Sequence, residues 1–178
     1  MGSASATATA LKVAFIGPPM SGKSTAARLL AGRLDDADVV SASAPLVQVE
    51  QVMLAVAGLN TVDVDREVRR SIKRLIRSAF DELGLDIVRE VFCRELAEAK
   101  AGVIINDDAR AALLPVLRSF AFKIVWVERG GAVTAVGPEG SQHDHTIDKA
   151  EADFVIANTG SLSDLETEVT RVQRSLGL

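Results

Sequence analysis

The sequence has a single cysteine, Cys93, and no apolar run long enough to span a lipid bilayer. One cysteine excludes a disulfide within the chain and favours a reducing compartment, so we expect Cys93 to be a buried structural thiol. The chain also lacks a basic excess, because 20 lysines and arginines stand against 24 acidic residues and give a formal net charge of −4. This balance argues against a nucleic-acid partner or a membrane surface, and we expect a cytoplasmic protein.

The composition that is present is globular, with 48% apolar and 25% charged residues in a chain of 178. This length predicts one domain with a real core. Residues 1–10 are small and polar, and lack the basic segment and apolar run of a secretory signal. Ala6 stands where a myristoylation motif has Ser or Thr. We therefore expect a disordered arm over 1–10 and a single domain over 11–178.

Short apolar runs alternate with longer helical periods along the chain, and no internal repeat is evident. This alternation is typical of an α/β fold with a parallel sheet. We expect five strands, at 11–16, 38–41, 102–106, 122–127 and 153–157. Helices are expected at 23–34, from Pro45 to a stop at Gly58, over 64–100 with an interruption near Gly84, at 109–119, and from Ser161 onward.

Two segments depart from this alternation. Residues 43–100 form a large helical insertion between the second and third strands, and residues 130–152 combine glycines and polar residues without a clear period. Both follow strands, at the carboxyl edge where ligands bind in α/β folds. We expect 43–100 to cover an acceptor and 130–152 to be a lid.

The segment from Gly17 to Thr25 matches the phosphate-binding pattern G-x-x-x-x-G-K-[ST]. An apolar strand precedes it and a helical period follows, so an ordinary glycine-rich turn is the weaker interpretation. Its glycines let backbone N–H groups approach phosphate oxygens, Lys23 would act on the β- and γ-phosphates, and Ser24 offers a hydroxyl to Mg²⁺. The predicted ATP-binding residues of this segment are Gly17, Pro18, Met20, Ser21, Gly22, Lys23, Ser24 and Thr25.

A P-loop alone does not define a reaction, because ATPases, GTPases and kinases share it. The sequence has no guanine-reading Asn-Lys-x-Asp segment, which argues against a GTPase. Two classes remain: a small kinase, or an ATP-dependent switch that binds a protein. The large insertion and the expected lid favour the kinase, since a switch does not need to enclose an acceptor.

Charged residues follow the third and fourth strands. Asp107 or Asp108 is expected at Mg²⁺ or its waters, the alternative being a helix cap, and Arg110 could bind phosphate through two hydrogen bonds. Arg129 could reach the transferred phosphoryl group. His143 and His145 could bind phosphate or metal, although histidines in such a segment are more often without a catalytic role.

The helix expected around 66–77 is strongly basic, with a local net charge of +5. Its cations are Arg66, Arg69, Arg70, Lys73, Arg74 and Arg77, against the single acid Glu67. A solvated face explains most of them. Because this helix belongs to the insertion, we also expect one or two of them, Arg74 and Arg77 first, to bind the phosphate of an anionic acceptor.

The sequence resembles the phage-type deoxynucleoside monophosphate kinases over most of the chain from Leu11 onward. The likeness lies in the P-loop, Ser43-Ala44-Pro45-Leu46, Asp108-Ala109-Arg110, Arg129, Ser141-Gln142-His143 and the segment from Ile156 to Leu162. The chain departs from the family at Ala44, where Asp is frequent, and at His143-Asp144-His145-Thr146, where His-x-Ser-Glu is frequent. Dephospho-coenzyme A kinase and adenylate kinase are looser likenesses, and the Asp-Gly-x-Pro-Arg of adenylate kinases is absent.

The resemblance implies a P-loop kinase with a five-stranded parallel sheet that transfers the γ-phosphoryl group of ATP to deoxynucleoside monophosphates with Mg²⁺. It implies catalytic roles for Lys23, Asp108, Arg110 and Arg129, and places Asn158, Gly160 and Ser161 along the adenine. Acceptor binding would fall to Ser43, Arg74, Arg77, Arg110 and His143. A homodimer is possible, several bases would be accepted, and a phage-encoded enzyme would act in the host cytoplasm. A kinase of another small metabolite, similar to dephospho-coenzyme A kinase, is the alternative.

Overall fold

The computed structural model describes residues 10–109, 111–129 and 149–178. Three expected features lie wholly or mostly outside these residues: residues 1–9 of the arm, most of the lid, and the side chains of Arg110, His143 and His145. The chain divides into two compact units, one made of Met1–Val40 with Ala99–Leu178 and the other of Ser41–Glu98. The second unit coincides closely with the helical insertion expected at 43–100, and its role in covering an acceptor stays a prediction.

The first unit is built on one five-stranded sheet in the order β2-β3-β1-β4-β5. Its strands are β1 (Leu11–Ile16), β2 (Ala37–Val39), β3 (Val103–Asn106), β4 (Lys123–Arg129) and β5 (Phe154–Asn158), and every pair is parallel. The expected five-stranded parallel sheet is confirmed. Because β1 is central, the loop that follows it leaves the middle of the carboxyl edge of the sheet.

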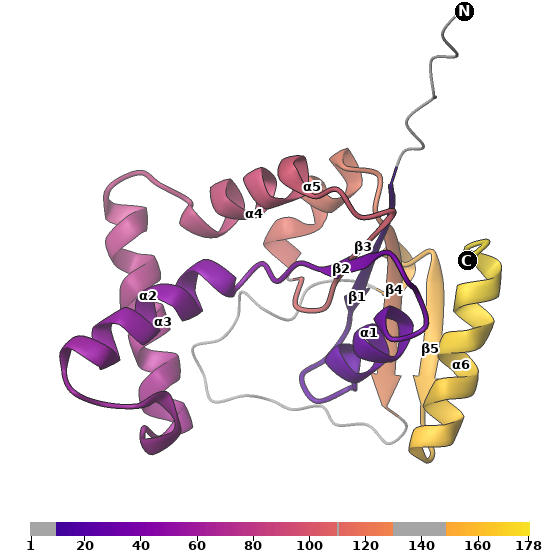
Figure 1. Cartoon of the computed structure of the whole chain (residues 1–178), viewed down its shortest axis with the longest axis horizontal. Coiled ribbons are helices and arrows are strands. Elements are labelled where there is room, and N and C mark those ends of the chain that lie inside the picture. The colour runs from indigo at the N-terminus through magenta and orange to yellow at the C-terminus, as the bar shows by residue number, and fades with distance from the viewer. Residues whose placement is uncertain (1–9, 110, 130–148) are drawn as a thin grey trace, which may run out of the picture. The chain divides into compact units, whose positions relative to one another are not determined.

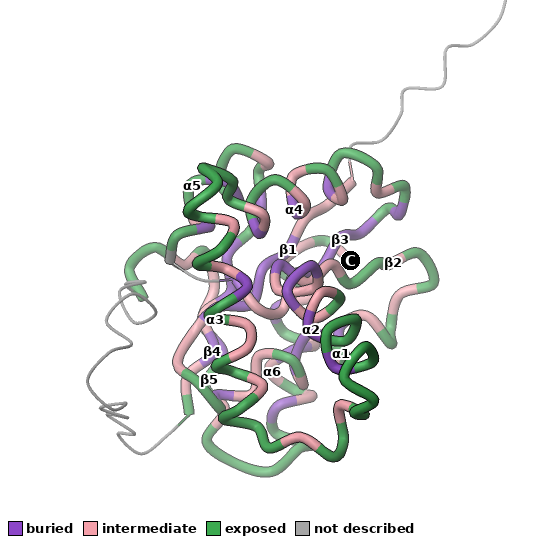
Figure 2. Tube along the Cα trace, turned by 90° about the vertical axis from the view of Figure 1, so that its left-hand side faces the viewer, coloured by how far each residue is buried: buried purple, intermediate pink, exposed green. Residues whose placement is uncertain are grey.

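The strands coincide with continuous apolar segments of the sequence. Val13 to Ile16 of β1 and Ile104 to Ile105 of β3 are almost completely buried (Figure 2). Strands that are covered on both faces read as unbroken apolar segments, which is why these strands were recognisable in the sequence.

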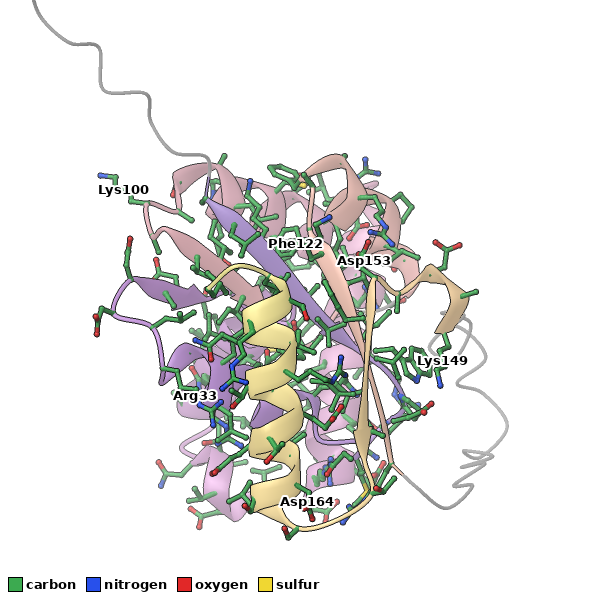
Figure 3. All side chains as sticks on the ribbon, turned by 90° about the vertical axis from the view of Figure 1, so that its right-hand side faces the viewer. Arg33, Lys100, Phe122, Lys149, Asp153 and Asp164 are labelled. Atoms are coloured by element: carbon green, nitrogen blue, oxygen red, sulfur yellow. The ribbon has the colours of Figure 1, made fainter. Side chains whose placement is uncertain are left out.

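Helices α1 (Lys23–Ala31) and α6 (Leu162–Ser175) lie side by side on one face of the sheet (Figures 1 and 3). Their apolar residues Ala27, Leu30, Leu165 and Val169 pack with Phe15 and its strand neighbours in one core. Burying a leucine or valine side chain stabilises a fold by about 1.5–3 kcal/mol. The core therefore fixes α1, and with it the loop that α1 follows, against the sheet.

Asp153 ties the start of β5 to β4. Its carboxylate accepts hydrogen bonds of 2.7 Å from the Ile124 backbone N–H and from Arg118. Burial alone would raise the pKa of Asp153, but these hydrogen bonds and the nearby positive charges outweigh it and lower that pKa. Figure 3 shows Asp153 and Phe122 at one end of the sheet and Asp164 at the other.

The Ser41–Glu98 unit contains α2 (Ala44–Val56), a 3-10 turn η1 (Thr61–Asp63), α3 (Arg66–Glu82) and α4 (Ile87–Glu98). Pro45 stands in the first turn of α2, and Asp65 caps α3 by accepting a hydrogen bond from the Glu67 backbone N–H at 2.8 Å. The buried apolar residues of the unit are Ala42, Pro45, Leu46, Leu54, Ile76, Val88, Phe92 and Leu96.

Several expected boundaries are wrong. α1 ends at Ala31 with Gly32 as its C-cap residue, three residues before the expected end. The helix expected at 109–119 begins only with α5 (Leu114–Ser119), after the 3-10 turn η2 (Ala111–Leu113). A further 3-10 turn, η3 (Lys149–Glu151), precedes β5, which runs one residue further than expected and includes Asn158.

Cys93 is partly exposed and not fully buried as expected. Among the helices of the described residues, none is long and apolar enough to cross a membrane.

Candidate functional site

The loop between β1 and α1 has a backbone that only glycine tolerates at its two ends. Gly17 has a φ of 140° and Gly22 a φ of 102°, and a Cβ at Gly17 would lie 2.2 Å from the Val127 carbonyl oxygen. Met20 adopts a φ of 61°, in the left-handed region that other residues rarely occupy. This strained, tightly packed turn brings the loop backbone to the centre of the carboxyl edge.

Lys23 is the first residue of α1, and its side chain reaches back over the loop. The Nζ atom donates hydrogen bonds to the carbonyl oxygens of Gly17 at 3.0 Å and Pro18 at 2.7 Å. Gly22, the N-cap residue, offers no side-chain cap to α1. Within the described residues no side chain caps this helix start, and the helix dipole favours negative charge at the same point.

A cavity of about 490 Å³ opens beside this loop. Residues from three separate parts of the chain line it: the loop with α1, the end of β4, and the segment from β5 into α6. The lining residues are Met20, Gly22, Lys23, Ser24, Thr25, Arg129, Asn158, Gly160, Ser161, Leu162 and Leu165. The structure thus brings together most of the predicted ATP-binding residues and Arg129.

Arg129 is the last residue of β4 and is exposed. Its Cα pairs in register with that of Asn158 in β5. The neighbouring acid, Glu128, is occupied by Lys149, whose Nζ donates to both of its carboxylate oxygens at 2.8 and 2.9 Å. The Lys149 hydrogen bond is the main reason that the pKa of Glu128 is lowered. Glu128 therefore forms an ion pair with Lys149, while the next residue, Arg129, lines the cavity.

Asn158 has a structural contact that the sequence did not reveal. Its Nδ2 atom donates a 2.8 Å hydrogen bond to the Ser21 carbonyl oxygen, across 137 residues of chain. The same amide would lie 2.5 Å from a Cβ at Gly22. Asn158 therefore braces the second half of the loop, in addition to lining the cavity where it was expected.

Ser161 and Gly160 both have structural roles at the start of α6. Ser161 caps this helix in a reciprocal box, in which its Oγ accepts from the Asp164 backbone N–H and its own N–H donates to the Asp164 carboxylate at 2.6 Å. That backbone hydrogen bond is the main cause of the lowered pKa of Asp164. A Cβ at Gly160 would lie 2.1 Å from the same carboxylate. The cap thus fixes the edge of the cavity.

Asp107 and Asp108 follow β3, the strand beside β1, and both are half-buried. Asn106 is fully buried, and its Nδ2 donates to the Val40 carbonyl at 2.8 Å and to Asp108 at 3.1 Å. Because β1 and β3 are parallel with Ala14 opposite Asn106, these acids leave the sheet at the edge that carries the P-loop. The described residues hold no group of three or more His, Cys, Asp and Glu side chains that could hold a metal ion.

The predicted acceptor-binding residues Ser43, Arg74 and Arg77 belong to the Ser41–Glu98 unit. The hydroxyls of Ser43 and Ser41 lie 3.3 Å apart in a hydrogen bond. Arg74 is exposed and donates to the Ser71 hydroxyl at 3.0 Å, while Arg77 is half-buried. Arg110 and His143, the other two, fall outside the described residues.

No protein-family model matches this chain, and no curated protein sequence matches it. Solved structures do match. Shikimate kinase from Aquifex aeolicus is 16% identical, with 94% of this chain and 99% of that chain covered and a TM-score of 0.54. TT1252 from Thermus thermophilus is 20% identical, with 94% and 98% covered and a TM-score of 0.53.

Shikimate kinase from Acinetobacter baumannii, in complex with shikimate, is 16% identical, with 97% of this chain and 98% of that chain covered and a TM-score of 0.53. At such identities the likeness concerns the fold. The chain has the P-loop kinase fold, with a parallel five-stranded sheet and flanking helices.

Proposed function

We propose that this protein is an ATP-dependent phosphotransferase that acts on a small anionic acceptor, specifically a deoxynucleoside monophosphate. The observation that carries the proposal is the phosphate-binding loop itself. Lys23, the uncapped start of α1 and Arg129 meet at one cavity, which gives a triphosphate two side-chain cations and a row of backbone donors.

Each residue has a separate task in this proposal. Lys23 neutralises the β- and γ-phosphates, and Arg129, together with Arg110, stabilises the charge on the group in transfer. Leu162 and Leu165 give the cavity an apolar wall for the base. Asn158 acts through the Ser21 carbonyl and is therefore a positioning residue.

The donors near β3 fit a magnesium ion. Mg²⁺ prefers one or two carboxylates together with substrate phosphates and water, and the half-buried Asp107 and Asp108 with the exposed Ser24 hydroxyl supply that set. Ser24 and one of these acids would hold the ion directly or through water. When bound, Mg²⁺ would neutralise phosphate charge and orient the triphosphate.

The reaction needs little covalent chemistry from the protein. An oxygen of the acceptor phosphate attacks the γ-phosphorus, the bond from that phosphorus to the β–γ bridging oxygen breaks, and ADP leaves with the electron pair. An attacking phosphate oxygen is largely ionised at neutral pH, so no strong general base is required. Positioning and charge stabilisation carry the rate.

The choice of acceptor is supported by the resemblance to deoxynucleoside monophosphate kinases and by the cations of α3. A hydroxy acid such as shikimate is the second candidate, favoured by the structural similarity to two shikimate kinases. Both acceptors carry a negative charge that a basic helix can recognise, but they differ in the atom that is phosphorylated.

We expect turnover with more than one deoxynucleoside monophosphate and weaker turnover with the matching ribonucleotides. The residues of 43–60 that could read a base are few, and one of them, Glu50, is already occupied by Arg69. A site with few placed hydrogen-bond partners rejects wrong bases weakly. An unpaired 2′-hydroxyl in an apolar wall costs about 1–3 kcal/mol, which is roughly a 5- to 150-fold loss.

The measurement is kcat/KM from coupled ADP release, for the four common deoxynucleoside monophosphates, their ribonucleotide counterparts and shikimate. Turnover of shikimate alone would select the second candidate. Preference for one ribonucleotide would reject the deoxynucleotide assignment, and no turnover of any acceptor would leave only an ATP-binding protein.

A smaller change is expected at Asn158. Replacing Asn158 with alanine removes the hydrogen bond to the Ser21 carbonyl, so the loop loses a restraint but no ligand contact of the Lys23 type. A neutral hydrogen bond contributes about 1 kcal/mol, so we expect KM for ATP to rise about fivefold with kcat less affected. Steady-state kinetics check this, with Asn158→Gln as a variant that keeps the amide; an unchanged KM in Asn158→Ala would show that the brace is unimportant.

A further inference from the structure

A fully buried carboxylate lies within the Ser41–Glu98 unit. Glu50 of α2 is 0% exposed, and Arg69 of α3 binds it through Nε at 2.6 Å and Nη2 at 3.4 Å. Lys73 adds a second cation, with Nζ 3.3 Å from the other carboxylate oxygen. Burial alone would raise the pKa of Glu50, but the hydrogen bonds and charges of Arg69 and Lys73 together lower it. Glu50 is therefore an anion held by two cations.

Arg69 and Lys73 belong to a row that continues to Arg77. These residues stand at i, i+4 and i+8 of α3, so their side chains leave the same face of the helix over about 12 Å. All three are partly buried, whereas the other cations of α3, namely Arg66, Arg70 and Arg74, are exposed. The side chains of Arg69 and Lys73 remain 31% and 29% exposed, so both still reach solvent.

The charges along this row do not balance. Glu50 neutralises one of the three positive charges, and within the described part of the chain Arg77 makes no ion pair with a carboxylate. Like charges one helical turn apart repel each other, and partial burial strengthens that repulsion. A purely structural ion pair with Glu50 would need one cation. Two uncompensated cations on one partly buried face are the arrangement that a bound anion would relieve.

Glu50 also prepares the row for a ligand. Its contact with Nε and Nη2 fixes the guanidinium plane of Arg69, whose Nη1 makes no hydrogen bond within the described residues. Lys73 uses one of its three donors on the same carboxylate. Side chains held in place before binding lose less conformational entropy when the ligand arrives.

We propose that Arg69, Lys73 and Arg77 form a binding site for the anionic group of the acceptor, and that Glu50 positions Arg69 and Lys73 within it. The identity of that anion as an acceptor group rests on the proposed function. The site keeps Arg77 from the residues expected in the sequence, adds Arg69 and Lys73, and gives Arg74 no part, because Arg74 is exposed and bonded to Ser71.

The test compares methionine variants, which keep an apolar stem of similar length and remove the charge. Arg77→Met is the first variant, because Arg77 has no ion pair in the described chain and its loss leaves Glu50 fully partnered. Lys73→Met is the second variant. Lys73→Arg keeps the positive charge and should therefore keep the binding of the anion that Lys73→Met loses. Arg70→Met is the matched control on the same helix, since Arg70 pairs with the exposed Glu67.

The readouts are the dissociation constant for dTMP and for inorganic phosphate by calorimetry, and KM for dTMP and for ATP. We expect Arg77→Met and Lys73→Met to weaken dTMP binding about tenfold or more, with KM for ATP within about twofold of the parent and Arg70→Met unchanged. Unchanged dTMP binding in Arg77→Met overturns the site, even if Lys73→Met is unstable. Equal losses in Arg70→Met also overturn it, because they would show a general charge effect.

This design separates the two proposals. Suppose that dTMP and phosphate bind the parent and that Arg77→Met and Lys73→Met lose this binding. The proposed site is then supported, even when no acceptor is phosphorylated and the proposed function is rejected. If deoxynucleoside monophosphates are phosphorylated with an unchanged KM in the row variants, the function stands and the site fails. If neither dTMP nor phosphate binds the parent protein, the site is rejected.

Discussion

Replacing Lys23 with methionine is expected to lower the rate of phosphoryl transfer by about 10²- to 10³-fold while the protein stays folded. The Lys23 ammonium lies over the P-loop, within 3.0 Å of the Gly17 carbonyl and 2.7 Å of the Pro18 carbonyl, so its charge is placed where phosphates would bind. Losing one preorganised charge of this kind costs about 2.7–4 kcal/mol of transition-state stabilisation. Methionine keeps an apolar side chain of similar length and removes the charge.

The measurement is single-turnover transfer from ATP, together with a thermal unfolding curve. Lys100→Met is the matched control: it removes the same charge from an exposed lysine that precedes β3, at the amino edge of the sheet (Figure 3). We expect the control to keep nearly full activity. Activity of Lys23→Met within about tenfold of the parent, with a normal unfolding curve, would reject the assignment of the P-loop as the catalytic centre.

Gly17→Ala is expected to damage both the fold and ATP binding. The new Cβ would lie 2.2 Å from the Val127 carbonyl oxygen and would stand on a backbone with a φ of 140°. Val127 cannot move aside easily, because β4 is paired with β1 on one side and β5 on the other. Overpacking and left-handed strain each cost about 1–3 kcal/mol, so we expect a loss of about 3 kcal/mol or more in unfolding free energy.

Gly58→Ala provides the comparison for this prediction. Gly58 also has a positive φ, of 72°, but a Cβ there would meet nothing within 4 Å. Only the strain of the left-handed backbone remains, which is about 1–2 kcal/mol. Urea unfolding of both variants separates the two costs. An equal loss at the two glycines would mean that the close contact with Val127 does not constrain the loop.

The P-loop and the sheet were predictable because their signals are contiguous in the chain. The pattern from Gly17 to Thr25 specifies a turn whose glycines, lysine and hydroxyl act within a few residues of one another. The strands were recognisable because burial on both faces demands unbroken apolar runs. The parallel five-stranded architecture followed from the alternation of these runs with helical periods, and the structure confirms it.

Helix ends were harder to predict, because competing signals of similar strength lie close together. α2 runs over Ala44–Val56, with Pro45 in its first turn and Gly58 soon after its end, close to the expected limits. The helix expected from residue 109 instead begins at Leu114, with a proline in its first turn, after the 3-10 turn Ala111–Leu113. Such boundaries are decided by fractions of a kcal/mol per residue, which tertiary packing easily overrides.

The sequence by itself determined the fold class, the phosphate-binding loop and the concentration of cations on α3, since each depends on residues that are neighbours in the chain. Only the tertiary structure decided which side chains become partners. It joined Asn158 to the Ser21 carbonyl across 137 residues, and it selected Arg69 and Lys73, among six cations on one helix, as the partners of a buried Glu50. A hydrogen bond or ion pair acts over a few ångströms whatever the separation along the chain, so these choices appear only once the strands and helices have packed.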